Sequence, residues 1–344
     1  MTNWGIVGHE WAVALLRRAL SEGRLGHAYL LTGPPRVGKR TLALALAKAL
    51  LCSSGSPPCG ECRTCMLVDR GRHPDLRIVE RPPDRKHLSI DEVRDLQHWA
   101  GLRPVEGAYH VGVVLHAEDL SQEAANALLK TLEEPPPSLV LVLTAADAGL
   151  LLPTVVSRCQ HLLLRRVPTA AIAGHLVREL GKGEEEARLL ASLANGRPGW
   201  AVEAARDEAL LAARLRALDD LEMLLNASRI DRLQYARGLA QLWGAERGEE
   251  VRDALLHWLG WWRDALLVAL GQPALVWNHD RLDALVRAAD RLALEDVRDA
   301  GEAVQRALTH LQQNVNPRLA LDVLLLALPR LGDRSSARVS PSRR

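Results

Sequence analysis

The stretch "GHAYLLTGPPRVGKRTLA", residues 26–43, decides the fold, because it combines a short buried strand, a glycine-rich loop and the start of a helix. Gly33, Gly38 and Lys39 fit the G-x-x-x-x-G-K pattern of a phosphate-binding loop. At the next position a Ser or Thr hydroxyl normally holds the magnesium of the nucleotide, and this chain has Arg40 there. The stretch predicts a phosphate-loop domain that lacks one of the usual metal ligands.

Strands and helices alternate through the first half of the chain. Apolar runs and helical periodicity predict, in order, helix 10–21, strand 28–32, helix 42–51, strand 75–80, a helix capped by Ser89 and Glu92, strand 110–116, helix 121–134 and strand 138–145. Strands that alternate with helices favour a mostly parallel sheet covered on both faces. We therefore expect an α/β domain over residues 1–164.

The second half of the chain is helical. Two short helices at 170–180 and 184–193 predict a small helical lid, which we place at residues 165–205. Long amphipathic segments rich in Ala and Leu predict an all-α domain over 206–331. The basic, Ser-rich residues 332–344 are expected to be a disordered tail.

Three tryptophans lie close together in the expected all-α domain. Trp258, Trp261 and Trp262 stand at helical spacing. A stripe of this kind is typical of core packing rather than of a surface that stacks on bases. We expect these side chains to be buried.

The composition limits the classes of function. A chain of 344 residues is too long for one ordinary core, so two or three domains are expected. The net charge of +2 gives no sign of a protein that coats nucleic acid, because phosphate affinity needs a clustered basic surface. The sequence has neither a basic-then-apolar leader nor an apolar run of about 18 residues, so we expect a cytoplasmic protein without a membrane partner.

Four of the five cysteines lie in one short segment. Cys52, Cys59, Cys62 and Cys65 form a C-x6-C-x2-C-x2-C array, a spacing that suits a structural Zn²⁺. The alternatives are an iron–sulfur cluster, four free thiols, and a disulfide pair, which a reducing cytosol disfavours. Four thiolates close the zinc shell, so we expect no catalysis at the metal. Cys159 is interpreted as a small buried residue.

Several motifs occur together in this chain. They are residues 26–39, the four-cysteine insertion, "HPDL" at 73–76, "NALLKTLEEPP" at 126–136, "SRC" at 157–159 and "NPRLALDVLLL" at 316–326. In this combination the chain resembles the clamp-loader branch of the AAA+ ATPases, whose complexes open a ring-shaped sliding clamp and set it on primed DNA. The resemblance implies an AAA+ α/β domain with a zinc-binding insertion, then a helical lid and a C-terminal helical collar that oligomerises.

The chain departs from the motor subunits of this family at the positions that act on ATP. Motor subunits carry Asp-Glu before the "NALLKTLEEPP" motif, and the same positions here hold Leu115 and His116. Leucine can neither hold magnesium nor activate water. The lid arginine of the motors aligns with Gly199, and Arg197 is two residues away. With Arg40 these changes imply that ATP hydrolysis is lost.

Two acidic residues follow the altered pair. Glu118 and Asp119 lie beyond the expected strand, in the following turn. That register does not fit a metal ligand or a catalytic base. We interpret both as surface charges or helix-capping residues.

Nucleotide binding is a separate question from hydrolysis. Gly33, Gly38 and Lys39 are intact, and backbone N–H groups at a helix N-terminus bind anions whatever the side chains. Thr41 offers a hydroxyl one residue late, which would reach a metal only if the helix shifted. The sequence leaves ATP binding undecided.

Arg158 of the "SRC" motif is the residue to which the resemblance assigns chemistry. An arginine at this place can reach the γ-phosphate of a nucleotide in a neighbouring subunit, as an arginine finger acting in trans. Judged on the tripeptide alone, Arg158 would be an ordinary exposed arginine.

These features lead to one hypothesis and two rivals. The hypothesis is a clamp-loader subunit that does not hydrolyse ATP, with gamma/tau and delta subunits as partners and with the clamp and primed DNA reached through the complex. A working motor of the gamma/tau type is the first rival. A zinc-dependent DNA-binding regulator is the second, although no obvious recognition helix is present.

Overall fold

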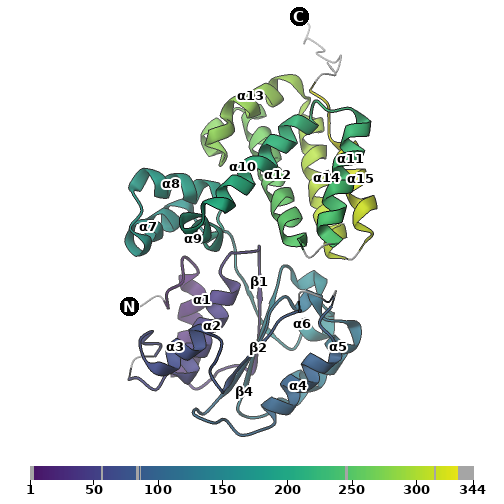
Figure 1. Cartoon of the computed structure of the whole chain (residues 1–344). Helices are drawn as coiled ribbons and strands as arrows, with labels where there is room; N and C mark the ends of the chain where they lie inside the picture. Colours follow the sequence, from purple (N-terminus) through teal and green to yellow (C-terminus); the bar gives the residue numbers. More distant parts are fainter. Residues whose placement is uncertain are drawn as a thin grey trace, which may run out of the picture. The chain divides into compact units, whose positions relative to one another are not determined.

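The structure is a computed structural model that describes residues 4–55, 57–82, 85, 87–244, 247–313 and 315–331 (Figure 1). The expected tail, 332–344, lies outside the described residues. The chain divides into two compact units, Met1–Val202 and Glu203–Arg344. Each unit has its own hydrophobic core.

A five-stranded parallel sheet forms the centre of the first unit, in the order β2-β3-β4-β1-β5. The strands are β1 (Ala28–Thr32), β2 (Leu76–Val79), β3 (His110–Val114), β4 (Leu139–Ala145) and β5 (Gln160–Leu163). All four expected strands are confirmed, and the α/β class with them. The fifth, β5, was not expected, because "QHLL" is short and three of its four side chains are exposed at the sheet edge.

Successive residues of a strand point to opposite faces, and β1 shows how both faces of the sheet become covered. Tyr29 and Leu31 belong to the core on one face, and Ala28 and Leu30 belong to the core on the other. The first face carries α1 (Glu10–Ser21), α2 (Lys39–Leu51) and α3 (Arg63–Asp69), and the second carries α4 (Ile90–Ala100), α5 (Gln122–Glu133) and α6 (Pro153–Val156), as Figure 1 shows.

Local signals explain where these helices begin. The capping box of α4 is confirmed, with the Ser89 N–H donating to Glu92 Oε2 at 2.9 Å. Helix α2 begins at Lys39, three residues before the expected start, because the glycine loop itself forms the helix N-terminus. Two short 3-10 turns, η1 (Ala117–Asp119) and η2 (Ala148–Leu150), follow β3 and β4.

The lid consists of α7 (Thr169–Leu180), α8 (Glu184–Leu193) and α9 (Pro198–Arg206). The first two helices were expected, and α9 begins inside the "NGRPG" turn. The lid up to Val202 belongs to the same compact unit as the sheet. A division into separate sheet, lid and collar domains stays a prediction.

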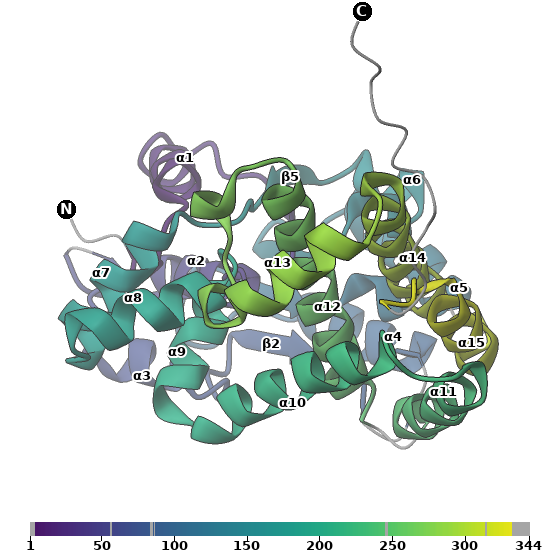
Figure 2. The ribbon, with the colours of Figure 1, turned by 90° about the horizontal axis from the view of Figure 1, so that it is seen from above.

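The second unit is all helical among its described residues. It contains α10 (Glu208–Leu224), α11 (Arg229–Gly244), α12 (Gly248–Ala269), η3 (Pro273–Leu275), η4 (His279–Arg281), α13 (Leu282–Arg291), α14 (Leu294–Gln312) and α15 (Pro317–Ala327). Helices α11 and α15 lie side by side in both views (Figures 1 and 2). Trp258, Trp261 and Trp262 are buried in its core, as predicted, and the Trp258 indole donates to the Ala217 carbonyl at 2.7 Å.

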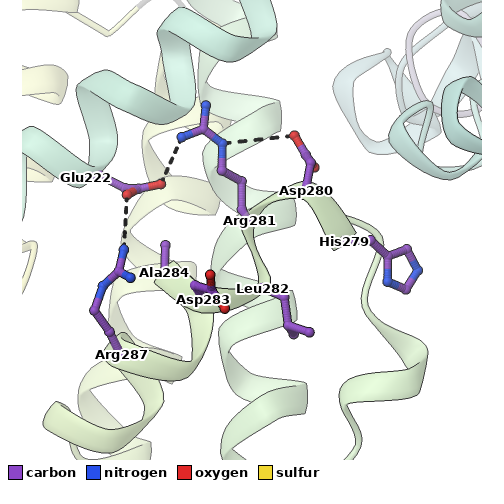
Figure 3. Close-up of a pocket in the computed structure, with 8 residues that line it drawn as sticks. All are labelled: Glu222, His279, Asp280, Arg281, Leu282, Asp283, Ala284 and Arg287. Atoms are coloured by element: carbon purple, nitrogen blue, oxygen red, sulfur yellow. Dashed lines mark hydrogen bonds and ion pairs between the residues drawn. The ribbon is translucent and has the colours of Figure 1, made fainter.

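A hollow of about 460 Å³ lies on the surface of this second unit (Figure 3). Its charged side chains pair with one another: Arg281 lies 3.3 Å from Glu222, and Arg287 lies 3.9 Å from the same carboxylate. Both arginines of the lining thus lie near a carboxylate of the same hollow. Within the described part of the chain, none of the helices has the length and apolar character required to cross a bilayer.

Candidate functional site

The glycine loop joins β1 to α2 at the carboxyl edge of the sheet, where α/β proteins bind their ligands. Gly33 has a φ of 143°, and a Cβ there would lie 2.2 Å from the Leu164 carbonyl oxygen. Gly38 has a φ of 116° and caps α2. Only glycine fits these two positions, so the loop keeps the backbone shape of a phosphate cradle.

Lys39 is bound to its own loop. Its Nζ donates to the carbonyl of Gly33 at 2.5 Å and to the carbonyl of Pro34 at 3.0 Å, and the residue is only 8% exposed. Arg40 and Thr41, the next two residues, are exposed on α2, and Arg40 lies 3.7 Å from Glu80. The structure thus brings Gly33, Gly38 and Lys39 together and places the Thr41 side chain on the exposed surface of the helix.

Leu115 and His116, which we expect at the positions of the motors' acidic pair, follow directly after β3. Leu115 is 2% exposed and lies in the core beside the sheet. His116 has a left-handed backbone, with a φ of 52°, and its N–H donates to Thr144 Oγ1 at 3.0 Å. Leu115 therefore contributes to packing and His116 to the connection between β3 and β4.

The interpretation of Glu118 as a surface charge is wrong. Its side chain is only 12% exposed and accepts the Ala146 N–H at 3.1 Å. Burial by itself would raise the pKa of Glu118, but hydrogen bonding and charge from His116, together with the Ala146 N–H, hold that pKa below its usual range. Asp119 is more exposed and pairs with Arg81 at 3.0 Å. No local pattern predicted the burial of Glu118, because its partner Ala146 follows a different strand, 28 residues along the chain.

The lid contacts the glycine loop directly. The N–H of Gly199 donates to the Arg36 carbonyl at 2.9 Å, and a Cβ at position 199 would lie 2.8 Å from that oxygen. Arg197, two residues earlier, is 2% exposed, and its Nε donates to the Ala194 carbonyl at 3.1 Å. Position 199 has no room for a side chain next to the loop, and Arg197 is buried within the lid.

Arg158 follows α6 and is 35% exposed at its side chain. Its Nη2 lies 2.6 Å from Glu133 Oε1, at the end of α5, and its Nη1 donates to the Thr154 carbonyl at 2.9 Å. The sequence did not predict the pair with Glu133, because the two residues meet only when α6 packs beside α5.

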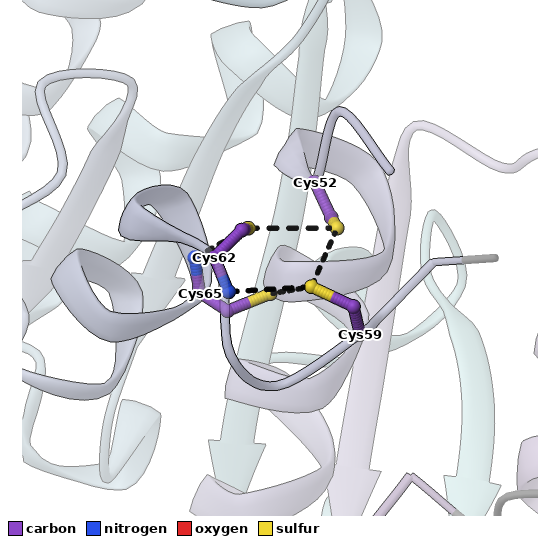
Figure 4. Close-up of side chains that lie close together, drawn as sticks. All are labelled: Cys52, Cys59, Cys62 and Cys65. Atoms are coloured by element: carbon purple, nitrogen blue, oxygen red, sulfur yellow. Dashed lines mark hydrogen bonds between the residues drawn. The ribbon is translucent and has the colours of Figure 1, made fainter. Parts of the chain in front are cut away.

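The four cysteines converge on one point (Figure 4). All four sulfurs lie within 4.8 Å of one another, and the Cys52 sulfur is 3.7 Å from that of Cys59 and 3.8 Å from that of Cys62. A tetrahedral zinc ion with bonds of about 2.3 Å to thiolates requires sulfurs about 3.8 Å apart. This cluster can therefore hold a metal ion, and its spacing fits a single ion.

The thiols of the cluster differ in their pKa. Backbone N–H groups of Glu61 and Cys62 lower the pKa of Cys59 to about 6, whereas burial raises the pKa of Cys65 to about 12. Thiols bind a metal as thiolates, so a cation bound in this cluster would lower the pKa of Cys65. Cys159, the fifth cysteine, is only partly buried at the edge of a core, and burial raises its pKa to about 11.

A buried carboxylate holds the loop beside the cysteine cluster. Asp75 of "HPDL" is fully buried and accepts the N–H groups of Val105, Glu106 and Gly107 at 2.6, 2.8 and 3.0 Å. Burial would raise the pKa of Asp75, but these three donors hold it below its usual range. Glu106 in turn accepts from Arg63 Nη1 at 3.0 and 3.1 Å, which ties α3 of the cluster to this loop.

The family and the relatives that this chain resembles are described as subunits of DNA polymerase III. Residues 8–168 match the family described as "DNA polymerase III, delta subunit". The DNA polymerase III subunit delta' of Bacillus subtilis is 29% identical, over 91% of this chain and 94% of that protein. The gamma/tau subunit of Mycobacterium bovis is also 29% identical, over 96% of this chain, and this chain spans only 62% of its length.

A similar solved structure is that of a DNA polymerase III gamma subunit-related protein from Thermotoga maritima. It is 20% identical, with a TM-score of 0.44, over 92% of this chain and 98% of that chain.

Proposed function

We propose that this chain acts as the delta-prime subunit of the DNA polymerase III clamp loader, and the match of residues 8–168 to the delta family and the 29% identity to the Bacillus subtilis delta' subunit support this proposal. In this role it is a rigid stator that helps to load a sliding clamp onto primed DNA during replication. It contributes to the DNA polymerase III holoenzyme, a DNA-directed DNA polymerase, without hydrolysing ATP itself. Its partners are gamma/tau and delta subunits, it reaches the clamp and DNA through the complex, and its location is cytoplasmic.

The contact between Gly199 and Arg36 carries this proposal. A motor subunit needs a lid arginine that reaches the phosphates, and here the corresponding residue lies against the loop backbone with no space for a side chain. The burial of Leu115 also supports the loss of hydrolysis, because a leucine side chain can neither hold magnesium nor activate water. In this reading the loop from Gly33 to Lys39 serves as a scaffold between strand and helix.

Arg158 carries the chemistry that we assign to the chain. It needs no nucleotide of its own, because a guanidinium can stabilise the charge that spreads over a phosphate during transfer in the next subunit. Its partial exposure supports this role, since a fully buried arginine could not reach another chain. We assign to it the part of an arginine finger in trans.

We also propose that the four-cysteine cluster binds a structural Zn²⁺. The sulfur spacing suits the bond lengths of zinc, and four thiolates would satisfy its tetrahedral shell. Cys62 caps α3, and its sulfur accepts the Cys65 N–H at 3.4 Å. The ion would hold the insertion between α2 and α3 in place and would take no part in a reaction.

The second candidate is a motor of the gamma/tau type, favoured by the equal identity to the mycobacterial gamma/tau subunit. ATP turnover by the isolated chain separates the two. We expect a rate no higher than that of Lys39→Ala, since Leu115 and His116 stand where a motor subunit would carry its acidic pair. ATP turnover by the wild-type chain that disappears in Lys39→Ala would show that the chain is a motor subunit.

The test of the trans role uses the reconstituted complex and its DNA-stimulated ATPase. Arg158→Ala should leave the subunit folded and assembled but cut the rate at the one adjoining site by about 10³. Arg94→Ala, which removes another exposed arginine, is the matched control and should change nothing. The proposal fails if Lys39→Ala strongly lowers the DNA-stimulated ATPase rate of the complex and Arg158→Ala leaves that rate unchanged.

A further inference from the structure

Arg158 is already engaged within its own chain. Its Nη2 lies 2.6 Å from Glu133 Oε1, and its Nη1 donates to the Thr154 carbonyl at 2.9 Å. A second, weaker contact of Nη1 reaches Ser157 Oγ at 3.5 Å. Both terminal nitrogens of the guanidinium thus have acceptors before any neighbouring subunit is involved.

A carboxylate and a phosphate compete for the same face of a guanidinium. Arginine binds both anions through the same N–H groups of its planar guanidinium, so these groups cannot all donate to a carboxylate and a phosphate at once. Glu133 neutralises the charge of Arg158 while the pair is closed. The pair must open before Arg158 can turn its Nη2 towards a phosphate.

The exposure of the pair determines how readily it opens. The side chains of Arg158 and Glu133 are 35% and 51% exposed, so solvent screens the attraction between them. An exposed ion pair shifts an equilibrium by about two- to fivefold at most. The pair is therefore strong enough to bias the position of Arg158 and weak enough to be displaced.

We propose that Glu133 is a positioning residue that holds Arg158 on its own subunit until a nucleotide phosphate bound to the neighbouring subunit displaces it. This inference rests on the proposed role of Arg158 in trans and adds the regulation of that residue. The holding equilibrium lowers the fraction of subunits whose arginine is free, and the apparent affinity of the adjoining site for ATP falls by the same factor. At saturating ATP the phosphate has displaced Glu133 everywhere, so the maximal rate is unaffected.

The neighbouring glutamate provides a matched control. Glu134 caps the end of α5, is exposed like Glu133, and has the same charge. Glu133→Gln removes the charge and keeps the shape of the holding side chain. Glu134→Gln makes the same chemical change one residue away from the pair.

The experiment measures KM and kcat for ATP in the reconstituted complex, for the part of the DNA-stimulated activity that depends on Arg158. Glu133→Gln should lower KM by about two- to fivefold and leave kcat unchanged, because only the holding equilibrium is removed. Glu134→Gln should leave both constants unchanged. In an Arg158→Ala background, Glu133→Gln should leave the remaining ATPase activity of the complex unchanged, because the residue that Glu133 holds is gone.

Each contrary outcome has a distinct meaning. If Glu133→Gln and Glu134→Gln give the same KM and kcat while Arg158→Ala strongly lowers the ATPase rate, the holding role of Glu133 is overturned. The trans role of Arg158 then stands. A fall in kcat with Glu133→Gln also overturns the proposal, because Glu133 would then aim Arg158 rather than hold it back. If Arg158→Ala leaves the ATPase rate of the complex unchanged, the proposed function fails and the holding role of Glu133 fails with it.

Discussion

The cysteine cluster and the phosphate loop are both short segments of the first unit with the pattern of a ligand site, and they differ in what each has kept. The cluster has its four ligands, with sulfurs at the spacing that one ion requires. The loop has kept its backbone shape at Gly33 and Gly38, but the side chains that would act on a nucleotide are replaced or bound internally. The cluster thus keeps the side chains that could hold an ion, whereas the loop keeps mainly its backbone shape.

The largest effect is expected from removing one metal ligand. Cys62→Ala should abolish the stoichiometric metal and lower the melting temperature, because the binding free energy of a structural zinc, about 10 kcal/mol or more, contributes directly to folding. Metal analysis and thermal unfolding of the purified chain measure both effects.

The control for this change is Cys159→Ala, which removes the cysteine outside the cluster and should leave the metal content unchanged. If freshly purified, unchelated protein contains no zinc, the cysteine cluster is not a zinc site, and its contrast with the phosphate loop disappears.

The next effect tests the contact between lid and loop. Gly199→Ala should destabilise the chain by about 1–3 kcal/mol, because the new Cβ would lie 2.8 Å from a backbone oxygen. Urea unfolding measures the change. Gly174→Ala, in α7 of the same lid, meets only the flexible end of Arg178 and should stabilise the chain by up to about 1 kcal/mol through helix propensity. Equal effects of the two substitutions would mean that the lid does not rest on the loop.

A smaller effect is expected where the loop binds its own lysine. Lys39→Ala removes two hydrogen bonds to the carbonyls of Gly33 and Pro34 and should cost about 1–2 kcal/mol of the free energy of unfolding. Denaturant unfolding without nucleotide and with ATP shows whether the residue has any further role. If ATP stabilises the wild-type chain but not the variant, the loop is a nucleotide site and the comparison with the cysteine cluster breaks down.

The smallest effect concerns Glu118 and its dependence on pH. Because its pKa is lower in the folded chain than in the unfolded chain, the stabilisation is complete above the unfolded value and disappears as the pH falls through the folded value. Glu118→Gln should therefore be about 1 kcal/mol less stable than wild type at pH 7, with the difference shrinking below about pH 4. Asp119→Asn, at a more exposed pair, should show a smaller loss. A difference that grew on acidification would contradict this account.

Much of the fold followed from local patterns. The four expected strands, the capping box at Ser89 and the buried tryptophans depend on residues within about one turn or one strand of each other. Strand β5 was missed because an edge strand with one buried side chain has no alternation to detect. The burial of Glu118 was missed because it depends on a connection 28 residues away.

The sequence by itself determined the glycine loop and the cysteine array, because in both cases the chemistry lies in residues that are close in the chain. Only the tertiary structure decided that Arg158 pairs with Glu133, that Gly199 lies on Arg36 and that Asp75 binds the loop before β3. These pairs join residues whose separation in the chain says nothing about their distance in space. The angles at which helices pack on the sheet and on one another set that distance, and those angles follow from the whole core rather than from any short segment.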